Sequence, residues 1–152
     1  MLKICTFVLG VLVILITTGF GGKTAYATAQ LSGQDNSAML FVGFDKAARR
    51  INQAAPYMLD EETRVDGATA GPGGLLTYHY TLLRYSSKDL NAELINKYLY
   101  PGVKKPLCAS SEMKSTLQYG GKFAFSYSGN DGIHIASFSI DRDVCGFSAL
   151  SP

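Results

Sequence analysis

Two histidines, His79 and His134, are the side chains of this sequence best suited to acid–base or metal chemistry. A protein metal site usually has at least three side-chain ligands, and no third ligand stands at a suitable spacing from either histidine. The HExxH, GxSxG, P-loop and GxGxxG motifs do not occur. Serines are numerous, so a Ser–His–Asp triad stays open as an alternative, but no serine is singled out. We predict no catalytic residue, no metal ligand and no cofactor.

A second group that could bind a cation is an acidic turn formed by Asp60, Glu61, Glu62 and Asp66. Calcium requires oxygen ligands at an ordered loop spacing, and this turn does not match an EF-hand. The sequence therefore predicts a solvated turn rather than a calcium site.

The cysteines point to one disulfide bond. Cys5 lies in a segment that we expect to be removed, which leaves Cys108 and Cys145 as an even pair in an exported chain. A zinc site or a catalytic thiol would be the alternatives, but there is no CxxC motif to support either. We predict a Cys108–Cys145 disulfide.

An export signal is predicted at residues 1–27. Lys3 is followed by an uncharged, mostly apolar run that ends at Phe20, and an AxA cleavage site ends at Ala27. We expect a periplasmic or secreted protein after cleavage, with a second site ending at Ala29 as an alternative. If the segment were not cleaved it would act as a membrane anchor, and this is the only membrane contact expected. No cysteine follows the apolar run at the position needed for lipid attachment.

Composition and net charge indicate a folded domain and argue against a nucleic-acid partner. The chain of 152 residues is 47% hydrophobic and 17% charged, which excludes an intrinsically disordered protein. Removal of Lys3 and Lys23 with the signal leaves twelve basic and twelve acidic residues. Nucleic-acid binding needs a basic excess, so no nucleic-acid partner is expected.

The hydrophobic pattern predicts helices and strands in residues 45–150, which we treat as a single domain. Residues 28–44 are predicted to be a flexible lead-in and possible start of the first helix. This helix is expected to begin at Ser37 or at Asp45 and to end at Pro56. Strands are expected at 64–70, 75–85, 122–128 and 133–140, with a bulge near Ala136 or burial of both faces in the last one. Helices are expected after Ser87, with a break at Pro101, and at 110–118.

Two hairpins with segregated helices define the expected fold. It is an α+β two-layer sandwich with a four-stranded antiparallel sheet, helices on one face and one disulfide. Leu76, Tyr78, Tyr80 and Leu82 are expected on one face of the second strand, and Thr77, His79 and Thr81 on the other.

Aromatic residues are the best candidates for a contact surface. Tyrosine is enriched at recognition surfaces, although core packing explains most of the nine tyrosines. We predict possible partner contacts at Phe41, Phe44, Tyr57 and Tyr85.

A resemblance is carried by the motif Asn52-x3-Pro56-x3-Asp60-x2-Thr63-x2-Asp66, by the strand Leu76-Thr77-Tyr78-x-Tyr80-Thr81-Leu82, and by Cys108-x4-Met113-Lys114-x2-Leu117-x2-Gly120 with Tyr127 and Cys145. Over residues 45–145 the chain resembles a family of small exported bacterial proteins, and more weakly the alternate pilotins of type II secretion. The second resemblance implies a small disulfide-bonded α/β domain that binds a short segment of an outer-membrane secretin. Those pilotins are lipoproteins, unlike the protein expected here.

These observations lead to one functional hypothesis and one rival. We expect an exported, non-enzymatic domain that binds a protein or peptide partner in the cell envelope, as a pilotin-like accessory factor or an inhibitor or immunity protein. The alternative is a small cell-envelope hydrolase whose catalytic site has no recognisable motif.

Overall fold

The computed structural model describes residues 31–150, with side chains from residue 36 onward. The predicted export signal and its cleavage site at Ala27 lie outside the described residues. Helices and strands follow one another as α1 (Leu31–Ala54), β1 (Tyr57–Met58), β2 (Thr63–Gly71), β3 (Leu75–Leu82), α2 (Ala92–Tyr98), α3 (Tyr100–Ala109), α4 (Ser111–Gln118), β4 (Lys122–Gly129), β5 (His134–Ile140) and α5 (Arg142–Cys145). Within this range, no helix has the length and apolar character that a membrane span needs.

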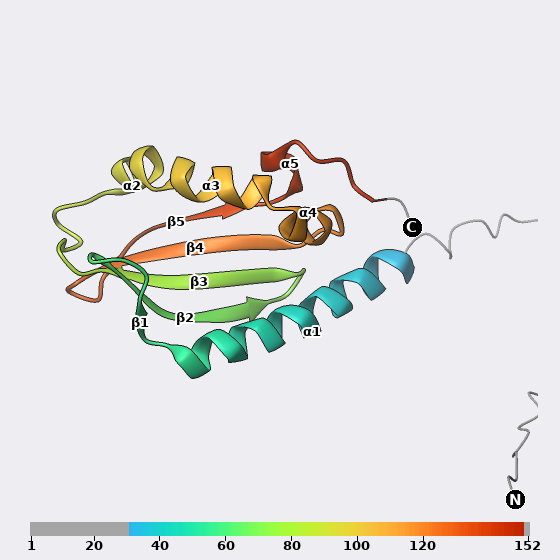
Figure 1. Cartoon of the computed structure of the whole chain (residues 1–152), viewed down its shortest axis with the longest axis horizontal. Coiled ribbons are helices and arrows are strands. Elements are labelled where there is room, and N and C mark those ends of the chain that lie inside the picture. Colours follow the sequence, from blue (N-terminus) through green and yellow to red (C-terminus); the bar gives the residue numbers. More distant parts are fainter. Residues whose placement is uncertain (1–30, 151–152) are drawn as a thin grey trace, which may run out of the picture.

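The sheet has five strands in the order β1-β2-β3-β4-β5. The predicted hairpins are the antiparallel pairs β2–β3 and β4–β5, but β3 and β4 run parallel, so the prediction of a four-stranded antiparallel sheet was wrong in two respects. Three helices carry the chain from the end of β3 back to the end where β3 begins, and this crossover makes β4 parallel to β3 (Figure 1). The fifth strand is the short edge strand β1, which pairs with Val65 and Arg64 of β2.

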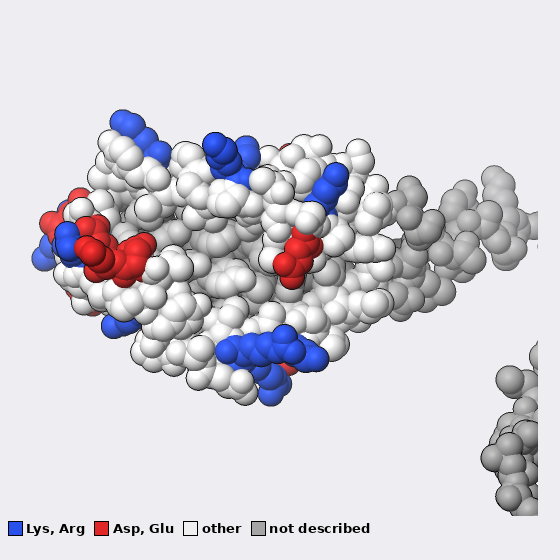
Figure 2. Space-filling view, in the orientation of Figure 1, with Lys and Arg blue, Asp and Glu red and all other residues white. Residues whose placement is uncertain are grey.

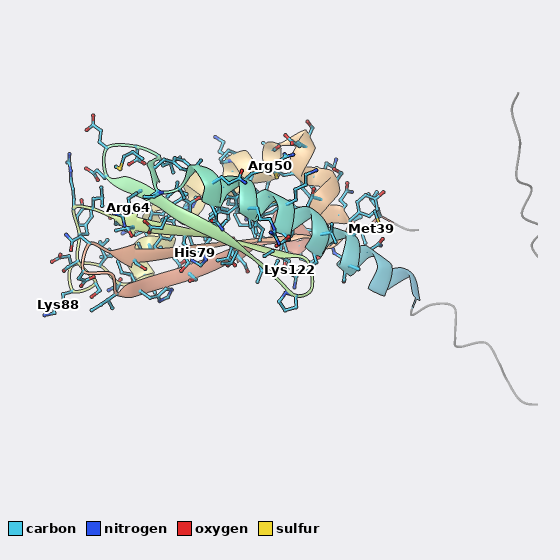
Figure 3. The ribbon with its side chains drawn as sticks, turned by 90° about the horizontal axis from the view of Figure 1, so that it is seen from below. Met39, Arg50, Arg64, His79, Lys88 and Lys122 are labelled. Atoms are coloured by element: carbon cyan, nitrogen blue, oxygen red, sulfur yellow. A yellow bond between two sulfur atoms is a disulfide. The ribbon has the colours of Figure 1, made fainter. Side chains whose placement is uncertain are left out.

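One face of the sheet carries the helices and the core. Leu76, Tyr78, Tyr80 and Leu82 alternate on β3 beside the matching residues of β4, which confirms the predicted parity. Helices α1, α2 and α4 each place a side chain in the core cluster on this face: Phe44, Ile95 and Leu117. Figure 3 shows α1 crossing one side of the sheet, whereas His79 lies on a strand that no described helix covers from the other side.

Helix α1 is longer than the sequence indicates. It includes both Ser37 and Asp45, so neither residue is its N-cap, and residues 31–44 are helical rather than a lead-in. Gly43 is tolerated inside the helix because the contacts of Leu40 and Phe44 with the sheet offset its low helix propensity.

The side chain of Asn52 joins α1 to the edge of the sheet. Its amide nitrogen donates to the Ala68 carbonyl oxygen at 2.9 Å, and its amide oxygen accepts from the Ala68 N–H at 2.7 Å. These two bonds replace the missing neighbour strand at this point of β2, because β1 is only two residues long. Asn52 therefore sets where α1 lies on the sheet.

Two predicted local features differ in detail. The break expected at Pro101 falls at Leu99, between α2 and α3, and Pro101 lies in the first turn of α3, where a missing N–H costs nothing. The irregularity in β5 falls at Ile135, since Tyr127 pairs with Ala136 and Ser128 with His134. A bulge thus explains the parity switch, one residue before the position expected.

Three aspartates hold the loops at one end of the sheet. Asp60 accepts the N–H groups of its own turn, Asp89 the N–H and hydroxyl of Ser86, and Asp131 the N–H and hydroxyl of Ser87. These hydrogen bonds favour the charged form and lower the pKa of all three carboxyl groups.

Acid is expected to destabilise this end of the protein. A lowered pKa in the folded state gives stability above the ordinary value of 3.8 that is lost as the pH falls through the folded value. Urea unfolding should therefore show a lower midpoint at about pH 3 than at about pH 6. Asp131→Asn should reduce the difference between the two conditions, whereas Asp143→Asn, at a side chain 82% exposed, should not. An unchanged pH dependence in Asp131→Asn would contradict this assignment.

Candidate functional site

A cleft of about 720 Å³ lies between α1 and α4 above the sheet. Figure 2 shows this face hollowed between α1 and the helices opposite it. Residues from α1, β3, α4, the turn after α4 and β4 line the cleft: Asn36, Met39, Leu40, Gly43, Phe44, Ala47, Leu76, Tyr78, Glu112, Met113, Ser115, Thr116, Tyr119 and Phe123.

The floor of the cleft is apolar and rigid. Leu76 and Phe123 are buried neighbours on β3 and β4, and Phe44 packs edge-on against Phe123 with ring centroids 5.3 Å apart. Tyr78 stacks on Phe125 beside them at 5.6 Å. Paired aromatic rings at these distances restrain one another, so the floor is formed before any ligand arrives.

The walls present exposed apolar side chains. Met39 on α1 is 73% exposed, and Tyr119 at the end of α4 is 53% exposed. Gly43 leaves a gap in the α1 wall, because a Cβ atom built there meets nothing within 4 Å. Gly121 lets α4 approach the sheet, since a Cβ atom there would lie 2.8 Å from the Thr116 carbonyl oxygen. The cleft is thus open to solvent and suited to an apolar ligand.

Electrostatics distinguish the interior of the cleft from its flanks. Among the residues whose side chains the structure describes, Glu112 is the only charged one that lines it. Figure 2 shows basic atoms on both flanks, on α1 below the hollow and on the helices above it. On α1, Arg49 is paired with Asp45 at 2.8 Å. A partner with acidic residues beside an apolar stretch would match this pattern.

The tyrosines under the helices are neutral phenols. Desolvation by burial raises the pKa of Tyr78 and raises that of Tyr127 to about 12. The same cause, assisted by the neighbouring phenol of Tyr127, raises the pKa of Tyr80. These groups therefore act as packing and hydrogen-bonding surface, since at neutral pH they have no ionised form to serve as a base.

The four aromatic residues predicted as contacts do not lie together on one surface. Phe41 is 43% exposed but does not line the cleft, and Phe44 is 7% exposed, with most of its ring in the core. Tyr57 on β1 and Tyr85 after β3 are each 41% exposed and lie away from the cleft. The proposed contact role of these four residues stays a prediction.

The four predicted contact residues do not include Met39, Gly43 and Tyr119, which line the cleft. The positions 36, 39, 40, 43 and 47 follow the spacing of one helical face, and this pattern could have identified the α1 wall. The late starts considered for the first helix obscured it.

The histidines lie apart from the cleft and from each other. His79 Nε2 is 3.0 Å from the Thr69 hydroxyl, and His134 Nε2 is 2.8 Å from the Ser137 hydroxyl. Strand β4 lies between the strands that carry them. Among residues 31–150, no group of three His, Cys, Asp or Glu side chains could hold a metal ion.

The disulfide links α3 to α5. Cys108 and Cys145 are bonded with their Cα atoms 5.4 Å apart, as the sequence predicts. Helix α4, which forms one wall of the cleft, lies within the chain segment that this bond closes.

Comparison with known proteins gives a fold but no family. No model of a protein family matches the sequence, and no curated protein matches it. Two solved structures with the same fold are pilotins of the type II secretion system, EpsS from Vibrio vulnificus and AspS from Vibrio cholerae. This chain has the pilotin fold.

The extent of the similarity is the same for both pilotins. EpsS is 12% identical with a TM-score of 0.59, covering 74% of this chain and 96% of its own. AspS is 14% identical with a TM-score of 0.57, covering 74% and 97%. A secreted protein of Pseudomonas aeruginosa is 17% identical, with a TM-score of 0.60 and coverage of 77% and 98%. The resemblance seen in the sequence is therefore confirmed at the level of the fold.

Proposed function

We propose that this protein is an exported, non-enzymatic accessory domain that binds an apolar segment of a cell-envelope protein in the cleft between α1 and α4. The observation that carries the proposal is the cleft itself, with its preformed apolar floor and exposed apolar walls. The cleft is open along its length between the two helices and offers mainly apolar surface, which suits an apolar segment of a protein.

The fold supports the same function. Two of its structural neighbours are secretion-system pilotins, and the sequence resemblance to pilotins implies a short secretin segment as ligand. A secretin segment is accordingly our first candidate for the partner. The basic flanks of the cleft favour a segment with acidic residues beside its apolar ones, because like charges would repel a basic one.

Gly43 offers the sharpest test of the cleft. Gly43→Trp should place an indole ring in the cleft and obstruct it, and a Cβ atom at this position meets nothing within 4 Å. Gly43→Ala, the matched control, should leave the cleft open, and alanine stabilises a helix interior by about 0.5–1 kcal/mol relative to glycine. We expect both variants to be folded by circular dichroism, and only Gly43→Trp to lose the partner that the wild type captures from envelope extract.

The enzyme alternative is tested in the same experiment. His79→Ala and His134→Ala should keep partner capture, because neither histidine lies in the cleft. Capture that survives Gly43→Trp would contradict binding in the cleft. Turnover of an envelope substrate that depends on either histidine would favour the hydrolase.

A further inference from the structure

A second hollow, of about 570 Å³, lies at the other end of β3. The cleft described above lies over Leu76 and Tyr78, and the second hollow lies over Leu82, so the two are separated along one strand. The turn between β1 and β2, strand β3 and helix α2 line it: Asp60, Glu61, Glu62, Thr63, Leu82, Tyr85, Leu90, Leu94, Ile95, Tyr98 and Leu99.

The hollow has an apolar floor and one apolar wall. Leu82 and Ile95 form a buried floor, at 6% and 2% exposure. Tyr85 and Tyr98 rise from it at 41% and 66% exposure. Large side chains that are this exposed around a hollow are uncommon on a surface that only meets water, and they mark interaction sites.

The opposite wall is acidic and held in place. Asp60 Oδ1 accepts the N–H groups of Glu62 and Thr63 at 2.8 and 2.7 Å, and the Leu83 N–H donates to the Glu62 carbonyl at 2.8 Å. The backbone of the turn and the Asp60 carboxylate are thus held in place, whereas the Glu61 side chain is 93% exposed.

The charge balance of this wall is negative. Three carboxylates line the hollow and, among the described residues, no basic side chain does, although Lys97 Nζ lies 5.3 Å from the centre of the Tyr98 ring. Arg84 approaches from outside, 2.7 Å from Glu62 and 3.9 Å from Glu61, and thus pairs with two of the three carboxylates. The hydrogen bonds that lower the pKa of Asp60 keep this carboxylate charged at neutral pH. Figure 2 shows acidic and basic atoms side by side at the end of the molecule where β1 and β2 join.

We propose that this second hollow binds a protein segment in which lysine or arginine stands beside apolar residues. The apolar residues would cover Leu82, Leu94 and Tyr98, and the cation would meet the carboxylates of the β1–β2 turn. This inference goes beyond the proposed function, because the site is distinct and has the opposite charge preference. The protein would then recognise two kinds of segment, an acidic one at the α1–α4 cleft and a basic one here.

Selection from a library of short random peptides, with the mature chain as bait, tests the proposal. We expect one class of selected peptides to combine lysine or arginine with apolar residues. Glu61→Lys reverses a charge on a side chain that is 93% exposed, and Tyr98→Ser removes apolar surface from a residue that is 66% exposed, so both variants should fold. Each should weaken this class about tenfold, the first through like-charge repulsion.

The matched control is Glu112→Lys, the same charge reversal at an exposed residue of the α1–α4 cleft. It should leave the basic class unchanged, as should Gly43→Trp. If no such class is selected, or if its binding survives both Glu61→Lys and Tyr98→Ser, the proposal is wrong. If this class fails while another class depends on Gly43, only the second hollow is refuted. If the basic class depends on Glu61 and Tyr98 while no selected class depends on Gly43, only binding in the α1–α4 cleft is refuted.

Discussion

Cys108→Ser is expected to lower the free energy of unfolding by about 4 kcal/mol. The cysteines are 37 residues apart, and a cross-link over such a loop removes conformational entropy from the unfolded chain. Because the closed segment includes α4, β4 and β5, its loss should be felt across half of the sheet and at one wall of the cleft. Urea unfolding of the mature wild type and variant, fitted to a two-state transition, measures the difference.

Three controls separate the disulfide from other effects of the substitution. Cys145→Ser should cost the same as Cys108→Ser, because either change opens the same loop. The double variant should cost little more than either single one, since the bond can be lost only once. Reduction of the wild type should bring it to the same level. If the fully reduced wild type unfolds at the same urea concentration as the oxidised protein, the disulfide does not have this stabilising role.

Strand patterns were predictable because they depend on residues two apart. The alternation of Leu76, Tyr78, Tyr80 and Leu82 against Thr77 and His79 fixed the core face of β3 before any partner strand was known. The disulfide was predictable for a similar reason, since export and an even number of cysteines left one pairing.

Features that depend on distant partners were not predictable. The parallel pairing of β3 with β4 follows from where the intervening helices lie, and no local pattern encodes that position. Strand β1 has only two residues, so alternation cannot reveal it. It exists because Val65 and Arg64 offer a free edge beside a turn that Asp60 holds.

The candidate site was only partly accessible from the sequence. Successive residues of a helix are rotated by about 100° around its axis. Two exposed residues on one helix can therefore face different neighbours, so one of them can line the cleft while the other does not. Phe41 and Met39 are both exposed, and only the position of α4 decides that Met39 lines the cleft. The alternation of residues on β3 gave the face of the sheet that carries the core, but not the two separate hollows on it.

Leu117→Ala is expected to cost about 3 kcal/mol, the range found when a large aliphatic side chain is removed from a packed core. Leu117 is fully buried, and it is the residue by which α4 packs into the core. Loss of its side chain leaves a cavity under the helix, and α4 carries Met113 and Thr116 of the cleft wall. We therefore expect a lower urea midpoint together with weaker partner binding.

Met113→Ala is the matched control, because Met113 is one turn away on the same helix and only partly buried. It removes cleft surface without a closed cavity, so it should weaken binding while costing about 1 kcal/mol or less. Leu117→Ala should lose both stability and binding, and Met113→Ala mainly binding. Equal losses of stability in the two variants would mean that α4 is held by its partly buried side chains and by the disulfide-closed segment, and that Leu117 is not its main anchor to the sheet.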